Sequence, residues 1–124
     1  MEKEMKKYIV MFLLITVSAQ AQQFSMTRQQ VEKLADAIYI SEGGNATVFP
    51  YGIKSVSCKG ETACRRICIN TINNNVKRFN NYGYKKHETY LEFLASRYCP
   101  IGAKDDPTGL NKNWIKNVRF YYEK

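Results

Sequence analysis

The 124-residue sequence contains a single histidine and no dense run of basic residues. This histidine, His87, lies in the polar stretch KKHETY, where no second metal ligand or nucleophile is close in sequence, and the chain has no nucleophile elbow. These absences argue against a zinc enzyme and against a serine or cysteine hydrolase. We therefore expect neither a metal nor a cofactor.

Long apolar runs are missing after Gln22, but one occurs before it. Residues 1–21 combine three early lysines, an apolar run from Tyr8 to Val17 and the small-residue pattern Ala19-Gln20-Ala21. This pattern is typical of a signal peptide and predicts cleavage after Ala21. We expect residues 22–124 to form one exported monomeric domain, periplasmic or extracellular, with no membrane span after cleavage. An uncut N-terminal anchor is the alternative.

Charge of one sign predominates. Without Lys3, Lys6, Lys7, Glu2 and Glu4, the 19 basic and 11 acidic residues become 16 and 9, which leaves a net charge of +7. This excess favours polyanionic partners such as nucleic acid, anionic lipid or a cell-wall polymer. The basic residues occur as scattered pairs, which argues against specific nucleic-acid binding.

Four cysteines lie in the expected mature chain: Cys58, Cys64, Cys68 and Cys99. In an oxidising compartment they allow up to two disulfides with three possible pairings. Cys64 and Cys68 are one helical turn apart, but their spacing is not that of a zinc site. Cys68 lies on an apolar stripe, so a buried unpaired thiol is also possible.

Apolar periodicity predicts a mainly α domain. The pattern Thr27-Arg28-Gln29-Gln30 is a capping box that begins a first helix, and Gly43-Gly44 ends it. Further helices are predicted near residues 61–80, 88–98 and 111–122. Residues 45–57, NATVFPYGIKSVS, are rich in β-branched and aromatic residues. They predict a short extended or β-hairpin segment after the first helix.

Glu42 is the candidate general acid of a catalytic site. It follows Val31 and Ile38 at helical spacing, so its carboxylate is expected to point along the buried face of the first helix. Apolar neighbours and the helix carbonyls would disfavour its charged form, as a general acid requires. The alternative is a solvated residue on a frayed last turn.

The stretches AIYISEGG and PYGIKSV resemble the lysozyme-like superfamily, closest to soluble lytic transglycosylases and goose-type lysozymes, and FLASRYCPIGA, DPTGLN and NWIKNV add to the resemblance. Together they touch most of residues 35–120. The chain departs from the family pattern at two places. At Gly43 the family usually has serine, and in place of Gly52-Ile53-Lys54-Ser55 the family has a Gly-Leu-Met-Gln type element. The resemblance implies an α+β lysozyme-like fold and cleavage of peptidoglycan glycan strands between N-acetylmuramic acid and N-acetylglucosamine, with Glu42 as the single acid.

A substrate site follows from this resemblance and from the chemistry of sugars, which present apolar faces and hydroxyls. Stacking is expected of aromatic rings and hydrogen bonding of amides, although most of these aromatics also fit a core. A second carboxylate could come only from Asp105 or Asp106, which also suit a turn. The expected substrate-binding residues are Tyr51, Gly52, Ile53, Ser55, Tyr98, Asn111 and Trp114, with Asn113 as a further amide.

Two other functional classes remain open at this stage. One is a non-catalytic secreted cell-wall-binding or inhibitor module on a lysozyme-like fold, because a fold does not fix a function. The other is a basic secreted effector that acts on membranes or nucleic acid, which would bind with a steep salt dependence. Neither class would depend on Glu42.

Overall fold

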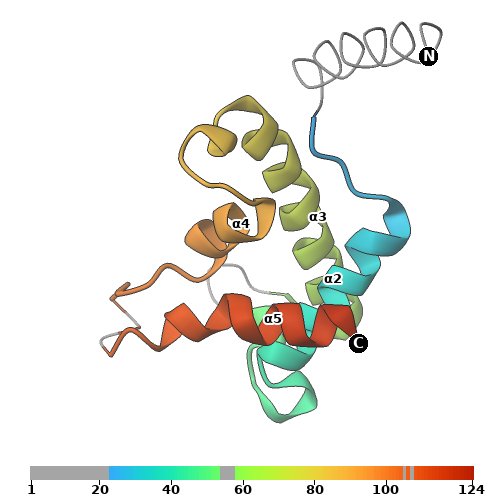
Figure 1. Cartoon of the computed structure of the whole chain (residues 1–124). Coiled ribbons are helices and arrows are strands. Elements are labelled where there is room, and N and C mark those ends of the chain that lie inside the picture. Colours follow the sequence, from blue (N-terminus) through green and yellow to red (C-terminus); the bar gives the residue numbers. More distant parts are fainter. Residues whose placement is uncertain (1–22, 54–57, 105, 107) are drawn as a thin grey trace, which may run out of the picture.

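A computed structural model describes residues 23–53, 58–104, 106 and 108–124. This part of the chain is mainly α, as predicted. Its four α-helices are α2 (Arg28–Ser41), α3 (Gly60–Asn81), α4 (Tyr90–Tyr98) and α5 (Trp114–Glu123), joined by the short 3₁₀ turns η1 (Gly44–Ala46), η2 (Pro50–Gly52), η3 (Gly83–Lys85) and η4 (Leu110–Asn113). Figure 1 shows α5 lying across α2, with the turn region that follows α2 at one end of the molecule.

The boundaries of α2 follow from local chemistry. The Thr27 hydroxyl accepts the amide of Gln30 at 3.1 Å, and the Gln30 side chain accepts the amide of Thr27 at 2.8 Å, so the predicted capping box is confirmed. The helix ends at Ser41, and Gly43 has a φ of 105°. Glycine reaches this left-handed conformation without a steric penalty, which lets the chain turn away from the helix axis.

The other helices bury one face each, close to the predicted positions. A common core forms where α2 packs against α3 and α5. The helix α4 also packs against α3 and α5. Its most deeply buried side chains include Ile38, Ile72, Leu94 and Val118, each 0% exposed. Thr89 caps α4 by accepting the amide of Glu92 at 3.2 Å. Four helices predicted from periodicity are thus confirmed, with ends that differ from the predicted ones by at most three residues.

The β-hairpin expected at residues 45–57 is not present in the described part of that segment. Residues 44–53 form η1 and η2, with local hydrogen bonds from Ala46 N to Gly43 O at 3.0 Å and from Gly52 N to Phe49 O at 2.8 Å. Pro50 has no amide hydrogen to donate to a strand, and Tyr51 has a φ of 61°. These local features override the strand preference of the β-branched and aromatic residues. Residues 54–57, which completed the prediction, lie outside the described residues.

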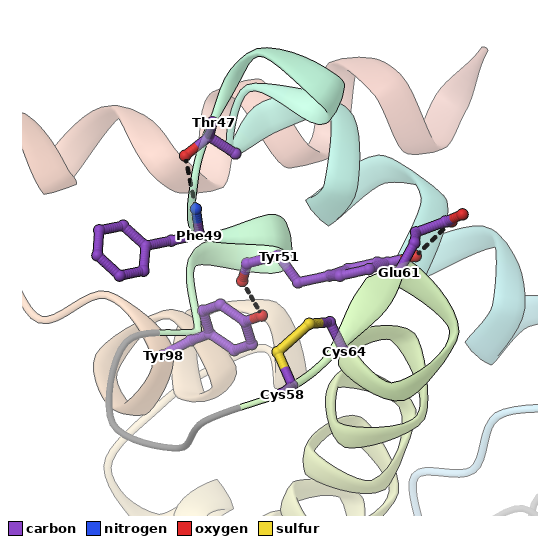
Figure 2. The surroundings of a disulfide bond; sticks show 7 residues. All are labelled: Thr47, Phe49, Tyr51, Cys58, Glu61, Cys64 and Tyr98. Carbon is purple, nitrogen blue, oxygen red and sulfur yellow. Dashed lines mark hydrogen bonds between the residues drawn. A yellow bond between two sulfur atoms is a disulfide. The ribbon is translucent and has the colours of Figure 1, made fainter.

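One disulfide joins Cys58 to Cys64, with Cα atoms 5.3 Å apart. It links Cys58, two residues before α3, to the second turn of that helix. Cys68 is a free thiol that is 0% exposed, as its position on the apolar stripe suggested. The disulfide therefore fixes Cys58 against the start of α3 (Figure 2).

The expected signal peptide, residues 1–21, lies outside the described residues. Within the described part of the chain, no helix combines the length and the apolar character that crossing a membrane requires.

We predict that Ile38→Ala lowers the free energy of unfolding by about 2 to 4 kcal/mol, because it leaves a cavity between α2 and its neighbours. Ile40→Ala is the matched control, two residues away on the same helix and 49% exposed. It should change the free energy by less than about 1 kcal/mol. Urea unfolding followed by circular dichroism measures both, and equal losses would contradict the core described here.

Candidate functional site

Glu42 is the residue directly after α2, and its side chain points toward α5. Its Oε1 atom accepts a hydrogen bond of 2.8 Å from the indole Nε1 of Trp114, the first residue of α5. The Glu42 side chain is partly exposed, whereas Trp114 is only 5% exposed. The direction of the carboxylate therefore agrees with the helical periodicity. The site thus holds a carboxylate that is fixed by a buried donor and belongs to a partly exposed residue.

Gly52 closes the other side of the carboxylate. A Cβ atom at this position would lie 2.7 Å from both Cδ and Oε2 of Glu42, closer than carbon atoms approach in folded proteins. Gly52 also has a φ of 68°, which side-chain-bearing residues seldom adopt. The backbone of η2 can therefore lie against Glu42 only because residue 52 is glycine.

Tyr98 connects these two sides. Its ring stacks on Trp114 with centroids 5.4 Å apart and an interplanar angle of 28°, and its hydroxyl donates to the carbonyl of Tyr51. Tyr51 precedes Gly52, so contacts run from Glu42 through Trp114, Tyr98 and the 51–52 backbone back to Glu42. Figure 2 shows the Tyr98 hydroxyl facing the Tyr51 carbonyl. This closed loop of contacts is called the Glu42 ring below.

Burial keeps the Tyr98 hydroxyl and the neighbouring Cys68 thiol neutral. It raises the pKa of the Cys68 thiol to about 12 and holds the pKa of Tyr98 well above its ordinary value, and the nearby charge of Glu42 acts in the same direction for both groups. The Tyr98 hydroxyl also lies 3.8 Å from Cys68 Sγ. Tyr98 therefore remains a hydrogen-bond donor to Tyr51 throughout the physiological pH range.

The structure corrects the roles expected of two aromatic residues. Tyr51 is 0% exposed and Trp114 is 5% exposed, so neither presents a ring face for stacking on a sugar. Both rings are fixed within the core, where Trp114 serves as the donor to Glu42. Ile53 is partly buried against the same core, and Ser55 lies outside the described residues.

The loop before α5 accounts for Asn111 and Asp106. The Asp106 side chain is buried, and its Oδ2 accepts the amides of Gly102 and Asn111, each at 3.1 Å. The side-chain amide of Asn111 donates to the carbonyl of Pro100 at 2.8 Å. These groups hold the loop together, as the turn alternative for Asp106 predicted. Asn113 is exposed just before α5, and Asp105 lies outside the described residues.

A metal site or a second pocket with reactive side chains would be the alternative to the Glu42 ring elsewhere in the described chain. No three His, Cys, Asp or Glu side chains there lie close enough together to hold a metal ion. An apolar groove of about 320 Å³ lies at the opposite end of α2 from Glu42. It is lined chiefly by Phe24, Met26, Leu34, Tyr90, Leu91 and Val118, and it holds no arrangement of acid and donor like that at Glu42.

No known family model, curated protein sequence or solved structure matches this chain. Inferences about its function therefore depend on the residues themselves.

Three features of the site were not predicted from the sequence. The first is Trp114 as the donor to Glu42, which joins residues 72 positions apart. The second is Arg65, which binds the Tyr51 phenol at 3.3 Å. The third is Phe49, whose 43% exposed ring projects from the turn that leads to Gly52 (Figure 2). The one local signal near these contacts is Pro50-Tyr51-Gly52, whose proline and glycine are common in turns but were included in the predicted hairpin segment.

We predict that Gly52→Ala is more destabilising than Gly102→Ala. Gly102 has a similar φ of 74° but nothing within 4 Å of the added Cβ, so it serves as a control for backbone strain alone. Gly102→Ala should cost about 1 kcal/mol, and Gly52→Ala about 1 to 2 kcal/mol more because it displaces the Glu42 carboxylate. Urea denaturation of both variants measures the difference, and equal costs would show that Gly52 does not contact Glu42.

Proposed function

We propose that the protein is a secreted peptidoglycan-cleaving enzyme of the lytic transglycosylase type, with Glu42 as its acid and base. The observation that carries the proposal is the fixed carboxylate of Glu42, held by the Trp114 indole on one side and by the Gly52 backbone on the other. A general acid needs such a fixed position relative to the bond that it protonates. The sequence resemblance to lysozyme-like proteins supports the same assignment, and we propose that the domain is related to them.

The hydrogen bond from Trp114 selects the oxygen that carries the proton. Oε1 accepts the indole N–H, so in the neutral acid the proton lies on Oε2. Glu42 donates this proton to the glycosidic oxygen as the bond from that oxygen to C1 of N-acetylmuramic acid breaks. The carboxylate then removes the proton of the muramoyl 6-hydroxyl, whose oxygen bonds to C1. The product is a 1,6-anhydro sugar, no water is consumed, and Glu42 is restored as the acid.

The use of a single carboxylate is supported by the contacts of Asp106. A hydrolase with two carboxylates needs the second on the opposite side of the sugar, about 5 to 10 Å from the first. Asp106 is 5% exposed and its Oδ2 accepts two backbone amides, so it is committed to the loop. Asp105 lies outside the described residues, and we propose that the substrate's own 6-hydroxyl takes the place of a second protein group.

Substrate binding is assigned to the exposed edge of the site. Phe49 replaces Tyr51 and Trp114 as the ring proposed to stack on a sugar, because it is 43% exposed and lies three residues before Gly52. The excess of basic residues attracts the anionic peptidoglycan, whose muramic acid peptides carry carboxylates. The partners are glycan strands, and no cofactor is involved.

We predict that Glu42→Gln lowers the initial rate of release of soluble fragments from purified sacculi by at least about 100-fold, because an amide is too weak an acid to protonate the glycosidic oxygen. Glutamine still offers an oxygen to the Trp114 N–H, so the fold should be preserved. Glu88→Gln, at an exposed position that is not part of the Glu42 ring, removes the same charge and should leave the rate unchanged within about twofold.

The same assay separates the alternatives. Equal release by the wild type and Glu42→Gln would contradict the role of Glu42. Binding of both proteins to sacculi without release of fragments would instead indicate a non-catalytic cell-wall-binding module. Binding that is lost steeply with salt and is equally strong for nucleic acid or anionic vesicles would indicate a basic effector.

A further inference from the structure

Tyr51 is the one residue other than glycine with a positive φ in the described part of the chain. A tyrosine in this left-handed conformation costs about 1 to 2 kcal/mol, so the surrounding contacts must stabilise it. Its side chain is also 0% exposed, which is unusual for a residue in a short turn. Strain of this kind often occurs where a backbone must be held in one position for function.

Three sets of contacts hold Tyr51. Its ring lies 5.0 Å from that of Tyr39, measured between centroids, and its carbonyl accepts the Tyr98 hydroxyl. Its phenol oxygen accepts a hydrogen bond of 3.3 Å from Arg65 Nη1 and lies 3.4 Å from Glu61 Oε1, to which it donates. Figure 2 shows the side chain extending from η2 toward Glu61 at the start of α3. The phenol therefore connects the strained turn to α3.

Arg65 is itself fixed from the other side by α2. Its Nη1 donates to Asp36 Oδ1 at 2.7 Å, and its Nη2 donates to the backbone carbonyl of Glu32 at 3.3 Å. Hydrogen bonds from Arg65 to Tyr51 and to Asp36, together with the charge of Asp36, hold the pKa of the guanidinium above its ordinary value despite partial burial. The guanidinium therefore stays charged and links α2, α3 and η2 at a single point.

We propose that Arg65 is a positioning residue that holds the 51–52 turn against the Glu42 carboxylate through the Tyr51 phenol. Arg65 lies on the far side of Tyr51 from the reaction and does not touch the substrate. If the phenol is released, the strained turn can relax, Gly52 moves away from Glu42, and the carboxylate gains room to rotate away from Trp114. Misplacement by about 1 Å is enough to slow a reaction that depends on a fixed acid by 10-fold or more.

Trp114 provides a test that does not depend on activity. It is the only tryptophan in the chain, so its indole N–H gives a single resonance in a nitrogen–proton correlation spectrum. Glu42→Ala removes the acceptor and defines the position of this resonance without the hydrogen bond. Arg65→Met and Tyr51→Phe should move the resonance toward that position. Arg66→Met, which changes the exposed neighbouring arginine, should leave it in place.

The kinetic part of the test rests on the proposed function. With soluble uncrosslinked glycan strands as substrate, Arg65→Met and Tyr51→Phe should lower kcat about 10-fold and change KM by less than twofold, whereas Arg66→Met should change neither. Arg65→Lys, which keeps the charge and a donor, should restore part of kcat.

The indole resonance and the kinetics test two separate claims, the positioning role of Arg65 and the proposed function. A shifted indole resonance in a protein without glycan-cleaving activity would support the positioning role and contradict the proposed function. An unchanged resonance in both Arg65→Met and Tyr51→Phe would overturn the proposal, even if both variants were less stable. If Arg65→Met does not fold, Tyr51→Phe decides alone, because it removes one oxygen and keeps the buried ring.

Discussion

The hydrogen bond between the Trp114 indole and the Glu42 carboxylate is the contact on which the site depends. It joins the C-terminal end of α2 to the first residue of α5 across 72 sequence positions. Such a hydrogen bond contributes about 1 kcal/mol when the acceptor is the neutral acid and about 1.5 to 3 kcal/mol when it is the carboxylate. Because Trp114 is 5% exposed, its N–H would be left unsatisfied without Glu42. The carboxylate is thus built into the packing of α2 against α5.

The rest of the Glu42 ring limits how that carboxylate can move. Tyr98 stacks on Trp114 and binds the Tyr51 carbonyl, while Gly52 leaves no space beside Glu42 for a side chain. The disulfide fixes Cys58 to α3, and Arg65 on α3 binds both the Tyr51 phenol of η2 and the polar groups of α2. A short turn without strands is therefore held by side chains from three helices.

The sequence predicted the features that depend on residues close together along the chain. The capping box at Thr27, the end of α2 before Gly43 and the buried faces of the helices all follow from local patterns, and the structure confirms them. The hairpin prediction was wrong for residues 45–53, because strand preference depends strongly on context, and Pro50 and the positive φ of Tyr51 favour a turn. The composition of residues 45–53 alone did not reveal this conflict.

The site was only partly predictable for a related reason. The direction of Glu42 follows from helical periodicity, but its donor comes from the last helix, and the arrangement of helices is not a local property. Tyr51 and Trp114 were expected at an exposed surface because aromatic rings suit both sugars and cores. Burial decides between these roles, and burial depends on how the helices pack.

The central claim is that one protein carboxylate, Glu42, cleaves the glycan strand with the help of the substrate's own hydroxyl. The most direct measurement is mass spectrometry of the glycan ends released when the purified protein digests peptidoglycan sacculi. The account predicts 1,6-anhydro-muramic acid ends. Reducing muramic acid ends would show that water attacks the sugar and would contradict the mechanism with a single carboxylate.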